Sequence, residues 1–380
     1  MFRNYKLVQT GLIAFTISMF CNQTFSQVTL EEPIFSAKRG FYEDSFELVI
    51  SSAQEGVKIN YSLDGSNPRN SSSAIKEASL VTIHINPEDT TGRDKAPGVV
   101  VRACAVKDNS VFSVVVTHTF LFINKVKTLS PDGQKPGPVW PDPNDTDIMF
   151  QYIDYGMDPD VLNDHRYRNY LDDALVSIPS ISLVTDLNNL FHPDSGIYVN
   201  AEERGKDWER KTSIELLHPD GSEGFQVNAG LRIRGGWFRH NYNPKHAFRF
   251  FFRAKYGPSK LRYPMFGEEG TDSFDKLDLR ISNNFSWSAM GDPTNTMNRD
   301  VFSRDTQQDM GQPYTRSRYY HLYINGTYWG LYQTQEQIKM AIIAESARWG
   351  DAKNERPLTK GDDWLQVGDF VETKKLILLK

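Results

Sequence analysis

The 380-residue sequence contains almost no cysteine. One of its two cysteines, Cys21, lies in an apolar leading segment, and the other, Cys104, stands alone in the apolar run VVVRACAV at residues 99–106. One remaining cysteine can form no intrachain disulfide and cannot build a cysteine-based zinc or iron–sulfur site. We therefore interpret Cys104 as a buried, unreactive thiol.

The sequence also lacks a large charge excess and long hydrophobic runs. Its 48 acidic and 43 basic residues give a formal net charge of -5, which does not favour nucleic acid as a partner. A membrane-spanning helix needs roughly 20 consecutive apolar residues. No segment after the first 20 residues approaches that length, so the sequence predicts no membrane span.

Residues 1–26 have the order of a cleavable export signal. A short basic start is followed by the apolar segment 11–20 (GLIAFTISMF) and by Thr24-Phe25-Ser26, which predicts cleavage before Gln27. Lipidation of Cys21 is disfavoured because the residue before it is a bulky phenylalanine. The protein is therefore expected to be secreted or to reside in the cell envelope.

The length favours two domains, because one hydrophobic core rarely serves 380 residues. Residues 27–122 show short, regularly spaced strand patterns and a turn at Asp64-Gly65, which predicts an immunoglobulin-like β-sandwich. The strands are expected at 46–51, 57–63, 79–85, 99–106 and 111–122.

Residues 123–147 form a proline-rich linker that is expected to be stiff and extended, without regular elements. Trp140 within it is expected to dock on a neighbouring domain, since a fully exposed tryptophan is unfavourable. The second domain occupies residues 148–380.

The second domain is predicted to be rich in antiparallel sheet with some helix, so that the whole chain is mainly β with some α. Residues 154–171 are expected to be loop, and Asn325-Gly326 predicts a type I′ hairpin between aromatic strands. Helices are expected from Thr296 or Asn298 to Met310 and over 336–348. Strands are expected at 178–186, 196–199, 211–217, 225–233, 246–252, 276–282, 317–324 and 328–333.

Strand alternation separates an apolar face from a charged face in this domain. Phe248 and Phe250 share one face, while Arg249 lies on the other together with Lys245, Phe251 and Arg253. Arg232 and Arg234 share a face of their strand, as do Asp278 and Arg280. Two interpretations stay open: a solvated face laced with ion pairs, or a surface that binds polyphosphate beside the Gly235-Gly236 turn.

Residues 57–68 (VKINYSLDGSNP) resemble the IxYTLDGSxP signature of the chitobiase/β-hexosaminidase carboxy-terminal domain, and residues 101–105 and 113–120 resemble its closing strands. The resemblance implies an accessory sandwich without catalytic residues. Aromatic residues such as Tyr61 and Phe46 alternate as core residues do, which favours a spacer role over contact with a polysaccharide.

Residues 230–236 (GLRIRGG) and 243–250 (NPKHAFRF) resemble the core motif of the CotH kinase family, RIRGxxS followed by KKSFRLxF. Residues 323–332 (YINGTYWGLY), followed by Glu336, resemble a second motif of that family. The likeness extends over about residues 178–340. It implies an atypical secretory protein kinase that uses ATP and a divalent metal, Mg or Mn.

The same resemblance implies roles for individual residues. Lys245 would contact the phosphates and Glu336 would position that lysine or the metal, by analogy with the lysine–glutamate pair of ordinary kinases. The turn over the phosphates and the cationic face would bind the nucleotide through Arg232, Arg234, Gly235, Gly236 and Arg249.

The metal ligands stay unknown, which is the main departure from the family. The family supplies its metal-binding aspartates from a later helical lobe with a Trp-Asp-x-Asp-like segment, and Asp362-Asp363-Trp364 resembles it only superficially. The second domain is therefore expected to be the amino-terminal part of an atypical kinase-like domain, incomplete and unable to transfer phosphate.

Two other function classes compete with a kinase fragment. An extracellular binding or adhesion protein would use both domains without catalysis, and its kinase likeness would reflect ancestry alone. A glycosidase ranks last, because it needs paired carboxylates on a large scaffold and the sequence shows no alternation of strands and helices. The protein substrate of a kinase stays unknown.

The export signal generates the first prediction. Mass spectrometry of the secreted protein should find a mature amino terminus near Gln27, because the basic, apolar and small segments occur in the order that signal peptidase recognises. Recovery of secreted protein that still begins at Met1 would contradict this prediction.

Overall fold

The structure is a computed structural model, and it describes the chain from Leu30 to Glu336 with gaps. The described residues are 30–77, 79–129, 133–143, 153, 155–240, 243, 245–281, 296–312 and 314–336. The export signal, the helix expected after Glu336 and the Asp362–Trp364 segment lie outside these ranges. Within them, no helix combines the length and the apolar character that crossing a membrane requires.

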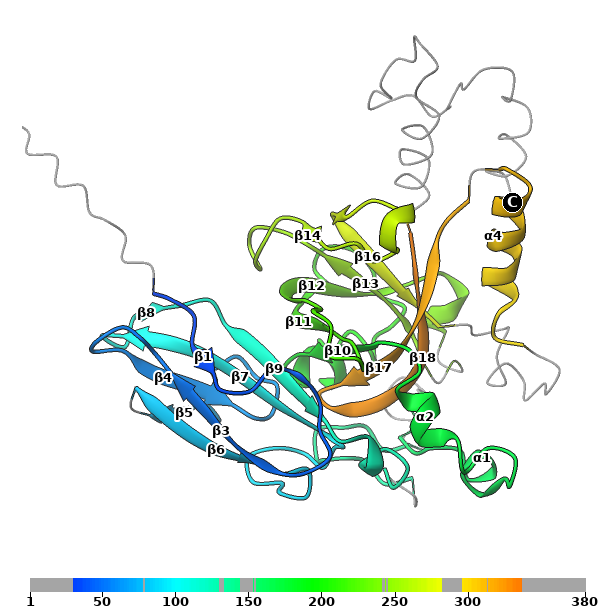
Figure 1. Cartoon of the computed structure of the whole chain (residues 1–380). Helices are drawn as coiled ribbons and strands as arrows, with labels where there is room; N and C mark the ends of the chain where they lie inside the picture. Colours follow the sequence, from blue (N-terminus) through cyan, green and yellow to red (C-terminus); the bar gives the residue numbers. More distant parts are fainter. Residues whose placement is uncertain are drawn as a thin grey trace, which may run out of the picture.

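The amino-terminal module (residues 30–122) consists of two sheets (Figure 1, blue to cyan). The first sheet has the order β1 (Ile34–Phe35), β3 (Phe46–Ser51), β6 (Leu80–Ile85). The second has the order β2 (Gly40–Phe41), β9 (Val116–Leu121), β7 (Gly98–Lys107), β4 (Lys58–Ser62), β5 (Ile75–Glu77), and β8 (Val111–Phe112) pairs with β7.

Both sheets contribute to one hydrophobic cluster. Leu48 comes from the first sheet, and Ile59, Val101 and Phe120 come from the second. Tyr61 belongs to this cluster, as its alternation predicted. Cys104 is buried and reduced, and burial raises the pKa of its thiol to about 11. The thiol is therefore protonated at neutral pH, which agrees with an unreactive role.

The second module (residues 123–336) is built around a closed barrel of seven strands (Figure 1, green to orange). All neighbouring strands pair antiparallel except β10 and β17, which pair parallel and close the barrel. The order is β10 (Ser180–Val184), β11 (Arg210–Leu217), β12 (Gln226–Arg234), β13 (Ala247–Phe251), β16 (Lys276–Arg280), β18 (Thr327–Gln335), β17 (Ser317–Ile324).

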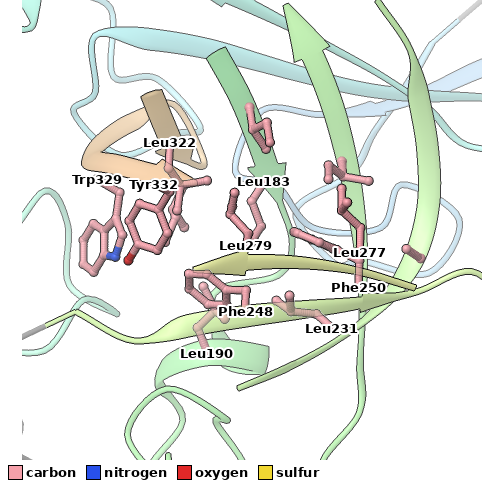
Figure 2. Packing of buried hydrophobic residues seen from close by; sticks show 14 of the residues in the cluster. Leu183, Leu190, Leu231, Phe248, Phe250, Leu277, Leu279, Leu322, Trp329 and Tyr332 are labelled. Atoms are coloured by element: carbon pink, nitrogen blue, oxygen red, sulfur yellow. The ribbon is translucent and has the colours of Figure 1, made fainter. Parts of the chain in front are cut away.

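The barrel interior is apolar because every strand alternates. Leu183, Leu231, Phe250 and Leu279 from four different strands belong to one hydrophobic cluster, and Figure 2 shows them gathered together. Burial of such side chains stabilises the fold by about 1.5 to 3 kcal/mol each. The outer faces of the same strands must then be covered by other elements or carry polar groups.

Aromatic side chains pack around Trp329 in the hydrophobic cluster of the barrel module. The Trp140 ring, from the proline-rich linker, lies 5.0 Å from Phe191 and 6.0 Å from Trp329. Its indole Nε1 donates to Asp94 Oδ2 of the amino-terminal module at 2.9 Å. Trp140 is only 1% exposed, so the prediction that it docks is confirmed. It packs into the barrel core and bonds to the other module.

The remaining elements are short. Outside the barrel, β14 (Leu261–Arg262) pairs with β15 (Ser273–Phe274). Among the described residues, the α-helices are α1 (Pro159–Asn163), α2 (Leu171–Leu175), α3 (Asn188–Phe191) and α4 (Arg299–Asp309). The 3₁₀ helices are η1 (Ile123–Lys125), η2 (Trp237–Arg239) and η3 (Gly267–Glu269).

Four sequence predictions are wrong in detail. Residues 196–199 form a turn rather than a strand, because the amides of Ile197 and Tyr198 bond back to the carbonyls of Asn189 and Leu190 around α3. The single strand expected over 111–122 divides into β8 and β9. The expected loop 154–171 contains α1 and the start of α2, and the linker 123–147 begins with η1.

The predicted hairpin is confirmed and lies against the amino-terminal module. Asn325 and Gly326 have φ angles of 46° and 81°, as a type I′ turn requires. The amide of Gly98 donates to Gly326 O at 2.9 Å. A Cβ atom added to Gly326 would lie 2.1 Å from Gly98 O, so this position accepts no side chain.

A buried carboxylate connects the two modules further along the interface. Glu215 on the outer face of β11 accepts hydrogen bonds from the amide and the hydroxyl of Thr119 on β9, at 3.2 Å and 2.5 Å. The Thr119 hydroxyl also contacts Ser182 Oγ at 2.8 Å, and Arg39 lies 3.5 Å from Glu215. Burial outweighs these favourable contacts and raises the pKa of Glu215 to about 6.

Glu215 should make the stability depend on pH. Its folded pKa exceeds its ordinary value of 4.5, so the folded state binds the proton more tightly and stability falls as pH rises from about 4.5 through 6. A shift of this size corresponds to about 2 kcal/mol. Urea unfolding at pH 4.5 and 7.5 should show that Glu215→Gln removes this loss, because the neutral amide can still accept from the Thr119 amide.

The matched control is Glu268→Gln, which changes an exposed carboxylate of the same module. It should leave the pH dependence unchanged. A Glu215→Gln protein whose stability falls over this pH range as much as that of the wild type would contradict the assignment.

Candidate functional site

The barrel places the predicted cations side by side on its outer wall. In the strand register Arg232 lies opposite Arg249, and Arg249 lies opposite Asp278. The residues between them along the strands, such as Phe248 and Leu279, point into the apolar core. The separation of a charged face from an apolar face is therefore confirmed.

Asp278 holds two of these arginines. Arg234 Nε donates to Asp278 Oδ2 at 2.7 Å, and Arg249 donates through Nε at 2.5 Å and through Nη2 at 2.8 Å. The carboxylate is only 2% exposed. The hydrogen bond to Asp278 raises the pKa of Arg249. Without this carboxylate, two neighbouring guanidinium groups would repel each other on a partly buried surface.

Glu209 holds a second group of cations beside the first. It contacts Arg232 at 2.6 Å, Arg253 at 3.3 Å and Lys255 at 3.2 Å. Burial tends to raise the pKa of Glu209, but hydrogen bonds from Arg232, Tyr256 and Lys255 outweigh it and lower the pKa. Glu209 therefore stays ionised among three cations.

A cavity of about 520 Å³ opens on this wall, and we call it the arginine cavity. Its walls include a turn at Gly235-Gly236, where Gly235 has a φ of 112° that disfavours any side chain. Three aromatic residues, Trp208, Phe238 and Phe251, also line it. The arginines that line it are Arg204, Arg232, Arg234, Arg239, Arg249 and Arg280.

Arg239 holds the cavity wall together and was missed by the sequence reasoning. Its guanidinium donates to the carbonyls of Ile233 in β12 and Gly235 just after it, and to those of Ala201 and Glu203 in the loop before β11. Burial, followed by neighbouring arginines, lowers its pKa to about 10. It stays charged at neutral pH and adds to the positive potential.

Arg204 and Trp208 were missed as cavity residues too, whereas Arg280 was placed on the charged face but not among the nucleotide-binding residues. Arg204 and Trp208 come from the loop before β11, for which no periodic pattern exists. Arg280 ends β16 and pairs with Asp300 of α4 at 2.5 Å. The sequence contained the information needed to place Arg280 on this wall, because strand alternation puts it on the same face as Asp278.

Phe251 is an apolar residue on the charged face, and cations cover it. The guanidinium carbons of Arg232 and Arg253 lie 4.4 Å and 4.9 Å from its ring centroid, and Lys276 Nζ lies at 5.8 Å. Such cation–π contacts contribute about 0.5 to 2 kcal/mol each. They help to hold like charges close together.

The structure separates the predicted catalytic pair from the arginine cavity. Lys245 Nζ lies 5.6 Å from the Trp329 ring centroid, and Glu336 pairs with Arg316 at 2.8 Å with both side chains fully buried. The five predicted nucleotide-binding residues all line the cavity, whereas Lys245 and Glu336 do not. The roles expected of these two residues stay predictions.

The part of the chain that the structure describes contains no group of three or more His, Cys, Asp or Glu side chains that could hold a metal ion. Two of the nearby carboxylates are already engaged: Asp278 contacts two arginines, and Asp300 contacts Arg280 and Arg304. The described residues therefore do not fit a Mg or Mn site.

Comparison with protein families gives two matches. Residues 231–364 match the family described as CotH kinase protein, and residues 48–120 match the family described as Fn3 associated. The first match begins in β12 and extends beyond the described residues, and the second lies in the amino-terminal module. No curated protein matches the chain.

Because Asp278 neutralises two arginines on the outer wall of the barrel, its removal should destabilise the fold. Asp278→Asn should destabilise the fold by about 2 kcal/mol, because it leaves Arg234 and Arg249 without a counter-charge in a partly buried site. Urea unfolding measures the change. Asp275→Asn is the control, since its ion pair with Lys260 is exposed and should matter by less than about 0.5 kcal/mol.

A double variant shows whether the stability lost in Asp278→Asn comes from the missing counter-charge or from altered packing. If the lost counter-charge is the cause, adding Arg249→Gln to Asp278→Asn should recover part of the lost stability, because one of the two unpaired cations is removed. Additive losses in the double variant would contradict this explanation.

Proposed function

Since the chain carries a CotH kinase domain at residues 231–364 and an Fn3-associated domain at residues 48–120, we propose that it is an exported, atypical kinase-type protein whose arginine cavity binds the polyphosphate of ATP. The observation that carries the proposal is the convergence of six arginines and a Gly-Gly turn on one cavity. The family supplies the expectation of ATP, and the cavity supplies a place for its charge.

Polyphosphate fits the chemistry of the cavity. Guanidinium groups form paired, charge-assisted hydrogen bonds to phosphate oxygens. Arg234 uses only Nε toward Asp278, and Arg249 uses Nε and Nη2, so further nitrogens of both groups are not used by that carboxylate. A triphosphate would also offset the repulsion among the arginines. When bound, ATP would supply the phosphoryl group that a kinase transfers.

The glycine turn supports the same assignment. A Cβ atom added to Gly236 would meet no atom within 4 Å, so the space around this glycine of the cavity wall is open. Backbone amides in glycine turns commonly bind phosphate oxygens at close range. We therefore assign the turn at Gly235-Gly236 to the phosphate end of the nucleotide.

The two modules take different parts in this proposal. The barrel module binds the nucleotide, and the amino-terminal module, proposed to be an immunoglobulin-type sandwich, acts as an accessory unit. The proposed place of action is outside the cytoplasm, because residues 1–26 have the order of an export signal. The acceptor is proposed to be another protein, as the family's kinase character implies.

Titration calorimetry with ATP tests the proposal. Arg204 is exposed, lines the cavity and has no carboxylate partner within the described residues, so Arg204→Gln should leave the fold intact. It should weaken ATP binding about tenfold, because a charged hydrogen bond contributes about 1.5 to 3 kcal/mol. The matched control is Arg262→Gln, an exposed arginine outside the cavity.

Competition identifies which part of ATP is bound. Inorganic tripolyphosphate should displace ATP, and adenosine should not. Lys245→Ala should weaken binding only if the lysine role implied by the family holds here, whereas Lys107→Ala in the amino-terminal module should have no effect. ATP affinity unchanged in Arg204→Gln, together with displacement by adenosine alone, would overturn the assignment to the cavity.

The alternative function is an extracellular binding protein without nucleotide chemistry, which predicts no ATP binding at all. The same protein incubated with radiolabelled ATP and Mg or Mn tests the expectation that it transfers no phosphate. Autophosphorylation would overturn that expectation. Variants at Asp300, Asp362 and Asp363 would then locate the carboxylates responsible.

A further inference from the structure

A second cavity, of about 360 Å³, lies between the two modules, and we call it the cleft. The amino-terminal module contributes Asn67, residues 69–71, Arg102 and residues 114–115, while the barrel module contributes residues from β11, β12, α3 and two loops. Its volume is in the range of small-ligand pockets. It shares no lining residue with the arginine cavity, so it is a separate site.

The cleft has an excess of positive charge. Arg69, Arg102, Lys211 and Lys255 line it, and Asp186 is the one carboxylate among its lining residues. Lys255 pairs with Glu209 at 3.2 Å. Within the described residues, the other three cations have no carboxylate within ion-pair distance. The lining therefore favours an anion.

Arg102 provides the second, independent observation. It is only 8% exposed, and its guanidinium donates through Nη1 to the carbonyls of Gly65 and Ser66 at 2.8 Å and 3.4 Å. Its Nε is buried without a hydrogen-bond partner. Burial lowers the pKa of Arg102 to about 10, so it stays charged at neutral pH. Glu215, Asp64 and Asp186 act against this lowering without cancelling it, so a further anion close to this buried cation would be favourable.

The rest of the lining is rich in amides and hydroxyls. Asn67 accepts from the Arg69 amide through Oδ1, and Asn189 donates to Thr185 Oγ1 through Nδ2, so each side chain uses one end of its amide in these bonds. Four asparagines and three hydroxyl residues line the cleft: Asn67, Asn70, Asn189, Asn228, Ser71, Thr212 and Tyr256. Groups that offer both donors and acceptors suit a ligand that carries many hydroxyls.

We propose that the cleft binds an acidic saccharide, with its carboxylate or phosphate beside Arg69, Arg102 and Lys211 and its hydroxyls against the asparagine amides. An apolar ligand fits poorly, since few aliphatic side chains line the cleft. Because both modules contribute cations, the ligand connects them and stabilises their contact. This site is independent of ATP and of the proposed kinase-type function.

Titration calorimetry with three probes tests the proposal: trigalacturonate, which carries carboxylates, glucose 6-phosphate, and neutral maltotriose. Wild-type protein should bind at least one acidic probe at least tenfold more tightly than maltotriose. The preferred acidic probe then distinguishes a carboxylated sugar from a phosphorylated one. The same probe should raise the unfolding temperature, because it binds only the folded state.

Variants assign the binding to the cleft. Lys211→Gln and Arg69→Gln change exposed side chains of different modules. Each substitution should lower the affinity for the preferred acidic probe about tenfold. Lys58→Gln changes an exposed lysine of β4 outside the cleft and should have no effect. Arg204→Gln in the arginine cavity should also leave saccharide binding unchanged, which separates this result from a failure of the nucleotide proposal.

Three outcomes would overturn the inference. If maltotriose bound as tightly as both acidic probes, the acidic group would not contribute to binding. If Lys58→Gln and Lys211→Gln lowered the affinity for the acidic probe equally, the probe would be attracted to positive charge without binding specifically in the cleft. Binding of neither acidic probe by the folded wild-type protein would leave the cleft without the proposed ligand.

Discussion

Closure of the barrel by the parallel pairing of β10 with β17 is the constraint on which the rest of the structure depends. A closed sheet has no free edge, and its alternating side chains divide into an inside and an outside. The inside becomes the apolar core around residues such as Phe248 and Leu231. The outside then needs either a protein cover or polar groups that tolerate water, and this protein uses both.

One part of the outer wall is covered by the amino-terminal module. Thr119 on β9 bonds to Glu215 and Ser182 on the outer faces of β11 and β10, and all three side chains are buried. Trp140 strengthens the same association, because its ring packs in the barrel core while its Nε1 bonds to Asp94. This tryptophan of the linker is thus part of the packed structure that joins the modules.

The adjoining part of the outer wall stays accessible to water and carries the cluster of arginine and lysine side chains. Glu209 lies between the two proposed binding sites, since it bonds to Arg232 of the arginine cavity and contacts Lys255 of the cleft. Each buried carboxylate there contacts more than one cation, so the surface keeps a positive excess while its closest pairs are neutralised. Such a surface is stable without a ligand and still attracts anions.

Local patterns in the sequence determined most of the strands, the Asn325-Gly326 turn and the placing of Arg232, Arg234 and Arg249 on a charged face, because alternation and turn chemistry act over a few residues. Only the tertiary structure decided that Arg204 and Arg239 join them, and that Glu336 pairs with Arg316. It also placed Asn325 against the Asp64 carbonyl at 3.3 Å, far away in the chain. Such contacts depend on how the closed barrel packs against its neighbour, which no short sequence pattern encodes.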